Sequence, residues 1–279
     1  MEFKSLLYET KNRKAYITLN RPEVLNAIDF NMPQEISQAV SLANSDPNVH
    51  VIVLSGKGRA FCAGYDLKAF AEAGIGTQSK VWDPIKDFQF MKQNTDYFTS
   101  LFKSLKPTIC KVHGYAVAGG SDIALCCDLI LMEKEAKIGY MPSRVWGTPT
   151  TAMWVFRLGL EKAKAMLFTG DTITGIQAKE WGLVLDAVEG EKLDEAIESL
   201  AERIAGVPVN QLVMQKLMIN QVADSMGINS VQVLASLFDG ISRHSPEGRW
   251  FQKYAAENGF HEAVKWRDSG KWIPEGGIE

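Results

Sequence analysis

The sequence contains no excess of basic residues and no long apolar run. Its 30 Lys and Arg are balanced by 33 Asp and Glu, which gives a net charge of −3 over 279 residues. Nucleic-acid-binding proteins normally carry a basic excess, so we expect no nucleic-acid partner. No window of about 18 residues is apolar and uncharged, and the longest apolar run, 123–132, is interrupted by Asp128. We therefore expect no membrane partner. Because the N-terminus lacks the features of a secretion or transit signal, we expect a cytoplasmic protein.

The sequence also has few potential metal ligands of the thiol and imidazole type. It contains four cysteines and four histidines, with no C-x-x-C pair and no H-E-x-x-H motif, so we expect no bound metal. The cysteines are Cys62, Cys110, Cys126 and Cys127. Two of them are adjacent in an apolar stretch, which suits buried reduced thiols better than disulfides. We predict free cysteines in the core and a reducing compartment.

Three common catalytic signatures are absent. There is no G-x-x-x-x-G-K-[ST] sequence, and Gly74 and Gly76 lack the third glycine and the preceding strand of a dinucleotide fingerprint. Ser121 does not lie in a G-x-S-x-G motif. These absences argue against P-loop proteins, nicotinamide-dependent enzymes and serine hydrolases.

What the sequence does contain is an alternation of strand-like and helix-like segments. Apolar β-like runs occupy residues 15–19, 49–54, 107–112, 129–132 and 184–188. Helical spacing of apolar residues marks residues 32–43 and segments that start at Ser121 and Leu193. This alternation predicts an α/β fold with mostly parallel strands. Residues 71–80 are predicted to form a loop.

The composition changes near Val207 and Pro208, and no convincing strand follows. From Leu193 nearly to the end, the apolar spacing is helical. We therefore predict an α/β part, residues 1–205, and a helical C-terminal part, residues 206–279.

Two glycine-bearing turns are the segments best suited to bind a ligand. One is residues 58–67 (GRAFCAGYDL), after a buried strand, and the other is residues 112–122 (VHGYAVAGGSD), which leads into a helix. Small residues allow close approach to the backbone, and the N–H groups at a helix start favour negative charge. Two such N–H groups aimed at one point would form an oxyanion hole. The alternative is a pair of ordinary turns that pack strands against helices.

Four ordered segments resemble one family. Residues 20–27 (NRPEVLNA), 61–67 (FCAGYDL) and 114–122 (GYAVAGGSD) match its L-N-R-P-x-x-x-N-A, F-x-A-G-x-D-L and N-G-x-x-x-G-G-G-x-E patterns. Residues 168–170 (FTG) and 178–184 (AKEWGLV) match its L-T-G…A-x-x-x-G-L-V pattern. Over most of residues 12–205 the chain resembles the crotonase superfamily, whose type member is enoyl-CoA hydratase.

The resemblance implies a crotonase-like spiral of ββα units in residues 1–205. It also implies a helical oligomerisation region in 206–279 that builds a homotrimer or a dimer of trimers. The substrate would be an acyl-CoA thioester, with coenzyme A as part of the substrate and no other cofactor. The backbone N–H groups of Tyr65 and Gly119 would form the oxyanion hole. Residues implied in coenzyme A binding are Asn26, Ala63, Asp66, Leu67 and Lys68.

The chain departs from the family where two glutamates normally activate water. Asp122 occupies the first position; it would be the general acid/base, or alternatively an acid that caps a helix. Ser143 occupies the second position, and a hydroxyl cannot replace a carboxylate base, although it could bind water or substrate. Arg144 and Trp146 would line the pocket, the alternatives being a surface charge and a core aromatic. Apolar residues of 82–97 would cover the acyl group or belong to the core.

These features predict an enoyl-CoA hydratase-type lyase that adds water to a 2-enoyl-CoA through an oxyanion-stabilised enolate. One alternative is an enoyl- or dienoyl-CoA isomerase in which a single acid, Asp122, shuttles the proton. Another is a non-catalytic acyl-CoA-binding protein, consistent with the missing second glutamate.

Overall fold

The computed structural model describes residues 3–68 and 81–273. The predicted loop at 71–80 lies outside these residues. The described strands are β1 (Leu6–Lys11), β2 (Lys14–Leu19), β3 (Val51–Gly56), β4 (Thr108–Val112), β5 (Tyr115–Val117), β6 (Leu129–Glu133), β7 (Lys137–Gly139), β8 (Thr172–Thr174) and β9 (Asp186–Val188). The described helices are α1 (Met32–Ser45), α3 (Pro84–Lys103), α4 (Gly119–Leu125), α5 (Met153–Thr169), α6 (Gly175–Glu180), α7 (Leu193–Ala205), α8 (Val209–Ser225), α9 (Ile228–His244), α10 (Pro246–Asn258) and α11 (Phe260–Asp268). Short 3₁₀ turns are η1 (Pro22–Val24), η2 (Met141–Arg144) and η3 (Gly190–Lys192).

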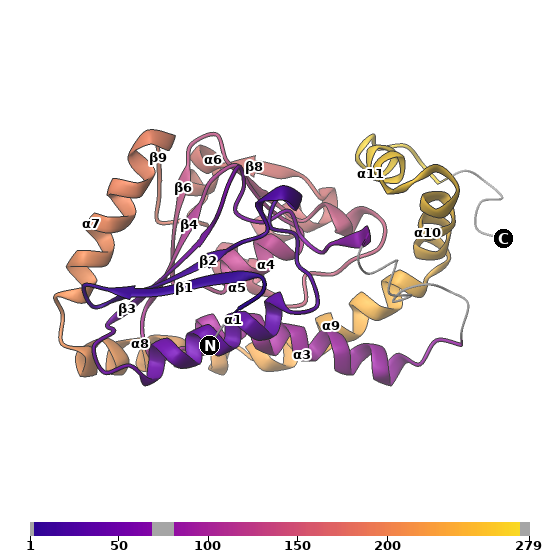
Figure 1. The fold of residues 1–279 in the computed structure, drawn as a ribbon. Helices are drawn as coiled ribbons and strands as arrows, with labels where there is room; N and C mark the ends of the chain where they lie inside the picture. The colour runs from indigo at the N-terminus through magenta and orange to yellow at the C-terminus, as the bar shows by residue number, and fades with distance from the viewer. Residues whose placement is uncertain (1–2, 69–80, 274–279) are drawn as a thin grey trace.

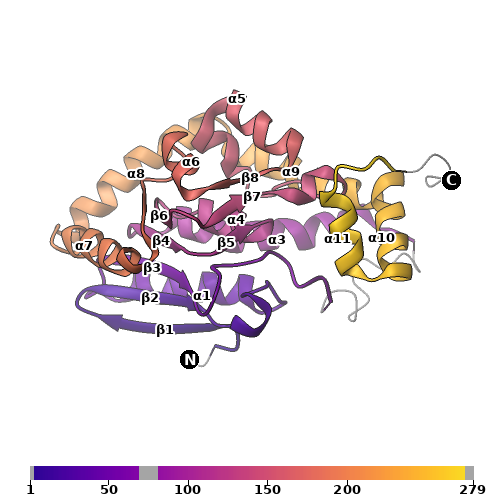
Figure 2. The same ribbon diagram turned by 90° about the horizontal axis from the view of Figure 1, so that it is seen from above.

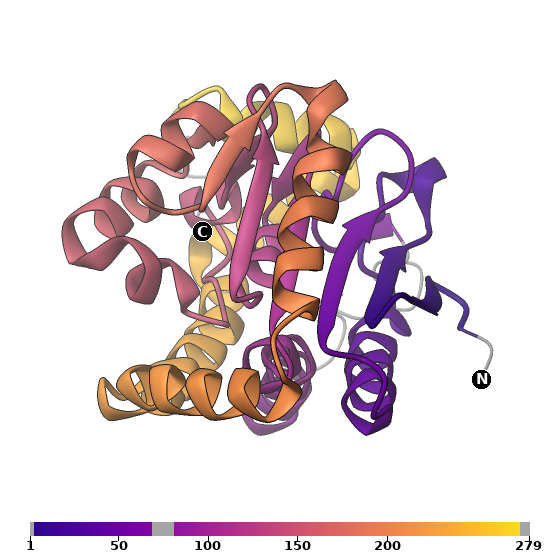
Figure 3. The same ribbon diagram turned by 90° about the vertical axis from the view of Figure 1, so that its left-hand side faces the viewer.

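The main sheet has the strand order β1-β2-β3-β4-β6-β9 within the described residues. Only the β1–β2 pair in it is antiparallel, which agrees with the predicted mostly parallel α/β fold. Alternate residues of β3 face opposite sides: Ile52 and Leu54 join the core beneath α1 and α3, whereas Val51 and Val53 pack toward α7. Figure 3 shows α7 standing across one face of this sheet. The continuous apolar run of β3 is thus explained by burial on both faces.

A second, small sheet includes part of the second glycine-bearing turn. It consists of β5, β7 and β8, with β5 parallel to β7 and β7 antiparallel to β8. Each strand has only three residues, too few for a detectable alternation, and the sequence did not predict them. β1 was also missed, because four of its six side chains are exposed and it lies at the sheet edge.

Most of the other predicted elements are confirmed with small shifts at their ends. The helix predicted from Ser121 begins earlier, at Gly119, and the strand predicted over 184–188 is shorter, at Asp186–Val188. All four cysteines are free and buried, as predicted. They pack in the same core cluster as Ile123 and Phe98.

After β9 the described chain is helical as far as Asp268. Figure 1 shows α8 and α9 running along the same side of the molecule as α1 and α3, and α9 packs on α3. Figure 2 shows α10 and α11 side by side at the end opposite α7. No helix in the part of the chain that the structure describes is long and apolar enough to cross a membrane.

Candidate active site

The two glycine-bearing turns lie against each other because their flanks pair in parallel. Cys62 N–H donates to Tyr115 O at 2.9 Å, and Val117 N–H donates to Cys62 O at 3.1 Å. Gly64 has φ +94°, and a Cβ there would lie 2.8 Å from the Ala118 Cβ and 3.4 Å from the Gly119 N. Only glycine fits so close an approach at a positive φ. The turns therefore meet as an oxyanion hole would require.

Helix α4 starts at this junction. Ala118 precedes it with φ 52° and ψ −129°, a backbone conformation that costs a non-glycine residue energy. Two hydrogen bonds hold Ala118 in this conformation. Its N–H donates to Gly139 O at 2.9 Å, and the Ala118 O accepts from Ser121 N–H at 2.9 Å. Gly119 is the first helical residue, so its N–H has no acceptor within the helix and lies at the positive end of the helix dipole.

A cavity of about 290 Å³ opens at this junction. Six of the predicted site residues line it: Ala63, Tyr65, Leu67, Gly119, Asp122 and Trp146. Phe90 and Met91, from the 82–97 segment, form part of its apolar wall. The remaining walls come from the segment around η2 and from helices α9, α10 and α11. The cavity thus combines a backbone N–H site, a carboxyl group and apolar walls.

Asp122 is 3% exposed and accepts a hydrogen bond from the Thr151 hydroxyl at 2.5 Å. Burial raises its pKa to about 7, with the hydrogen bond from Thr151 opposing the rise and the nearby Asp239 adding to it. A carboxyl group with such a pKa can both give and take a proton near neutral pH. Asp122 is the fourth residue of α4, and its carboxyl group accepts from Thr151, which lies outside this helix. This arrangement favours acid/base chemistry over capping of α4.

Sequence reasoning missed a second carboxyl group in the cavity. Asp239, on α9, lines it together with Arg243. The Asp239 carboxylate accepts hydrogen bonds from Arg243 Nε at 3.1 Å and from Thr148 N–H at 3.2 Å. Burial raises the pKa of Asp239, and the charge of Arg243 opposes the rise. Acid and base four residues apart on a helix normally form a surface pair, so no sequence signal pointed to the cavity.

Three residues predicted to bind coenzyme A lie outside the cavity lining. The Asn26 amide donates to Lys57 O at 2.9 Å and Ala60 O at 2.8 Å, so both of its N–H groups are used in holding the first turn. Asp66 accepts from Arg21 at 2.9 Å. The Lys68 side chain is exposed. Asn26 therefore acts on the backbone of this turn.

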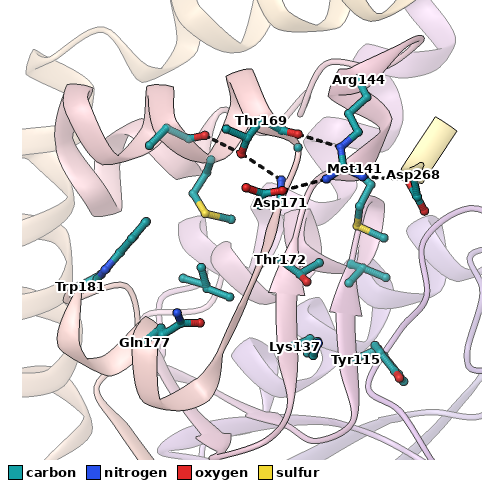
Figure 4. A pocket seen from close by; sticks show the side chains of 15 residues that line it. Tyr115, Lys137, Met141, Arg144, Thr169, Asp171, Thr172, Gln177, Trp181 and Asp268 are labelled. Atoms are coloured by element: carbon teal, nitrogen blue, oxygen red, sulfur yellow. Dashed lines mark hydrogen bonds and ion pairs between the residues drawn. The ribbon is translucent and has the colours of Figure 1, made fainter. Parts of the chain in front are cut away.

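Ser143 and Arg144, on η2, are not among the residues that line the cavity. The Ser143 hydroxyl donates to Tyr140 O at 2.9 Å, within the turn. Figure 4 shows Arg144 above a different cavity, of about 590 Å³, where it bonds Thr169 O at 2.7 Å and Asp171 at 2.9 Å. The structure therefore brings Trp146 to Asp122, but not Ser143 or Arg144. In the described ranges, no group of three or more His, Cys, Asp or Glu residues is arranged to hold a metal ion.

Comparison with known sequences identifies relatives over most of the chain. A family model described as enoyl-CoA hydratase/isomerase matches residues 9–258. The (E)-benzylidenesuccinyl-CoA hydratase of Thauera aromatica is 34% identical over 201 residues, which cover 71% of this chain and 75% of that protein. The crotonyl-CoA hydratase of Syntrophomonas wolfei is 29% identical over 208 residues, covering 73% of this chain and 76% of the other.

Solved structures show the same fold. An enoyl-CoA hydratase from Mycobacterium smegmatis has 47% sequence identity and a TM-score of 0.91, and the match covers 96% of this chain and 94% of the other. An enoyl-CoA hydratase/isomerase from Xanthobacter autotrophicus Py2 has 28% identity and a TM-score of 0.88, with coverage of 97% and 100%. The match of nearly whole chains confirms the predicted fold.

Proposed function

The chain belongs to the enoyl-CoA hydratase/isomerase family, and on this premise we propose that it is a hydratase-type lyase that adds water to a 2-enoyl-CoA. The observation that carries the proposal is the position of Asp122. Its protonatable carboxyl group lines the same cavity as the N-terminal residue of α4 and the facing Tyr65 turn. That arrangement supplies a proton and a site for negative charge within one enclosed space.

In the proposed reaction, the thioester oxygen accepts hydrogen bonds from the N–H groups of Tyr65 and Gly119. Water adds to the β-carbon, and the electrons of the double bond move through the α-carbon onto the thioester oxygen. The N–H groups and the dipole of α4 stabilise this enolate. The neutral Asp122 then gives its proton to the α-carbon. The proton that the added water loses returns to the Asp122 carboxylate, which completes a 3-hydroxyacyl-CoA and regenerates the neutral acid.

The second candidate is isomerisation of an enoyl- or dienoyl-CoA, with Asp122 moving a proton between carbons. Isomerisation is favoured by Ser143, which stands where the family has its second glutamate. Ser143 is not a carboxylate and does not line the cavity. A non-catalytic acyl-CoA-binding protein is the third candidate. Net addition of water separates the first proposal from the other two.

We also propose that coenzyme A enters only as part of the substrate and that Ala63, Leu67 and Lys68 lie near its adenine end. The apolar wall that includes Phe90, Met91 and Trp146 would receive the acyl group. The proposed assembly is a homotrimer or a dimer of trimers, and the proposed location is the cytoplasm. Exposed apolar side chains on α8 support the assembly, because large exposed apolar patches commonly mark protein interfaces.

The test is hydration of crotonyl-CoA and of longer and branched 2-enoyl-CoAs by the purified protein. Asp122→Asn keeps the shape of the side chain but removes its acidic proton, so we expect kcat/KM to fall by about 10²–10⁴. Asp122→Glu restores a carboxyl group and should recover part of this loss. Full activity in Asp122→Asn would rule out the assigned role. Deuterium incorporation into the 2-enoyl-CoAs without net addition of water to any of them would support isomerisation instead of hydration.

A further inference from the structure

Hydration of a 2-enoyl-CoA requires two proton transfers in different places. One proton leaves the attacking water near the β-carbon, and another reaches the α-carbon. Asp122 accounts for one transfer, but Ser143 does not line the cavity and cannot serve as a carboxylate base. The question is which other group of this cavity takes the remaining proton.

Asp239 has the geometry for this task. It lines the same cavity as Asp122 and Gly119 and is 5% exposed. One of its oxygens accepts from Thr148 N–H and the other from Arg243 Nε. A carboxylate has about four acceptor positions, so two remain for a water molecule. The two existing hydrogen bonds fix the orientation of the group.

The charges around the two carboxyl groups differ. Arg243 lies between Asp239 and Asp87 of α3, which it contacts at 2.7 Å, and this pairing favours the ionised form of Asp239. Asp122 instead has a neutral partner, the Thr151 hydroxyl, and Asp239 further favours its protonated form. Burial raises the pKa of both carboxyl groups, but within the described residues only Asp239 has a cation in contact with it. Asp239 is therefore the better suited of the two to act as the base, and Asp122 to act as the acid.

We propose that Asp239 is the second carboxylate of the reaction: it binds the attacking water and takes its proton. This inference rests on the proposed hydration. The water O–H bond breaks as the oxygen bonds to the β-carbon, and the released proton goes to Asp239. Asp122 loses its own proton to the α-carbon. Transfer of one proton from Asp239 to Asp122, directly or through water, then resets both groups, so that the net change is addition of H₂O.

The experiment compares Asp239→Asn with Asp87→Asn in the full-length protein. Each substitution removes one of the two negatively charged partners of Arg243, but only Asp239 lines the cavity. We expect Asp239→Asn to lower the kcat for hydration by about 100-fold or more, with KM within about threefold of wild type. Asp87→Asn should stay within about fivefold in kcat, and Asp239→Glu should recover at least about tenfold over Asp239→Asn.

A second readout separates chemistry from structure. Exchange of the α-hydrogens of butyryl-CoA with D₂O needs Asp122 and the oxyanion hole but no attacking water. Asp239→Asn should therefore exchange at the wild-type rate, whereas Asp122→Asn should not exchange. If Asp239→Asn does not fold, Asp239→Ser leaves Arg243 paired with Asp87 and carries the same expectation of slow hydration with retained α-hydrogen exchange.

Three results would overturn the inference while leaving the hydratase proposal intact. They are hydration by Asp239→Asn within about fivefold of wild type, an equal loss in Asp87→Asn, and a parallel loss of exchange and hydration in Asp239→Asn. A wild-type protein that hydrates none of the thioesters would instead overturn the proposed function, and this inference with it.

Discussion

At the scale of single residues, the decisive feature is a carboxyl group buried beside a hydroxyl instead of a cation. Within the described residues Asp122 takes part in no ion pair, and burial raises its pKa to about 7. An unfolded aspartate titrates near pH 4, so the folded protein binds the extra proton between about pH 4 and pH 7. The contribution of Asp122 to the free energy of unfolding is consequently most favourable below this window and becomes less favourable as pH rises through it. The same property suits Asp122 to its proposed role as a proton donor near neutral pH.

This predicts that Asp122→Asn stabilises the protein at about pH 8 but not at about pH 4.5. Asparagine cannot ionise, so the variant avoids a penalty that reaches about 4 kcal/mol for a shift of about three pKa units. Thermal or urea unfolding at the two pH values measures the difference. Asp96→Asn, at an exposed position on α3, serves as the control and should show no comparable pH dependence. An equal effect of Asp122→Asn at both pH values would contradict the prediction.

The hydration rate should follow the same ionisation. The pKa of Asp122 is about 7 in the free enzyme, whose ionisations control kcat/KM. If neutral Asp122 donates the proton to the α-carbon, kcat/KM should therefore fall about tenfold per pH unit above about pH 7. In the α-hydrogen exchange reaction Asp122 acts as the base, so that rate should rise through the same pH range. A pH–rate profile of both reactions checks the opposite slopes. Parallel slopes would be inconsistent with the assignment.

At the scale of elements, the site depends on direct backbone contact between the first turn and helix α4. A Cβ at Gly120 would lie 2.3 Å from Cys62 O, a rigid backbone atom. We therefore expect Gly120→Ala to destabilise the protein by about 1–3 kcal/mol and to lower activity by displacing α4. Urea unfolding and the hydration assay measure the two effects.

Gly206→Ala is the matched control for that substitution. It follows α7 with φ −73°, and a Cβ there would come no closer than 3.5 Å to its nearest neighbour, Arg203 O. We expect it to be neutral or slightly stabilising, by about 0.4–1 kcal/mol, because alanine restricts the unfolded chain. Equal destabilisation by the two substitutions would show that the contact with Cys62 is not the cause.

How far the sequence predicts each element depends on where its signal lies. β3 and α7 were predicted because their apolar residues repeat within one segment. The meeting of the two turns was anticipated from glycine placement and resemblance, which are also local in sequence. The position of Asp239 in the cavity was not predicted, because its burial follows from the packing of α9 on α3, a helix far away in the chain. Arg144 lies outside the cavity for a similar reason. It forms ion pairs with Asp171 and Asp268, which are distant in sequence and which no local sequence pattern relates to Arg144.

At the scale of the whole molecule, the proposed assembly accounts for apolar surface on α8. Its exposed side chains include Met214, Leu217, Met218, Ile219 and Val222. Met218 is 67% exposed. We expect wild-type protein to be a trimer or hexamer by analytical ultracentrifugation, and Met218→Glu to shift it toward monomers, because a charge placed in an apolar interface is strongly unfavourable. Gln93→Glu adds the same charge at an exposed polar position on α3, outside this apolar face, and should leave the assembly unchanged. A monomeric wild-type protein would exclude the proposed assembly.

The contribution of α9, α10 and α11 to the cavity also determines when the cavity can form while the chain is being synthesised. The two glycine-bearing turns, Asp122 and Thr151 all precede these helices in the chain, whereas Asp239, Val264 and Arg267 lie within them. A ribosome therefore completes the turns long before it completes the walls. The lining residues that α9, α10 and α11 supply are absent from a growing chain until those helices have been made. A chain that ends before α9 lacks these walls, and under the proposed function we expect it to be inactive.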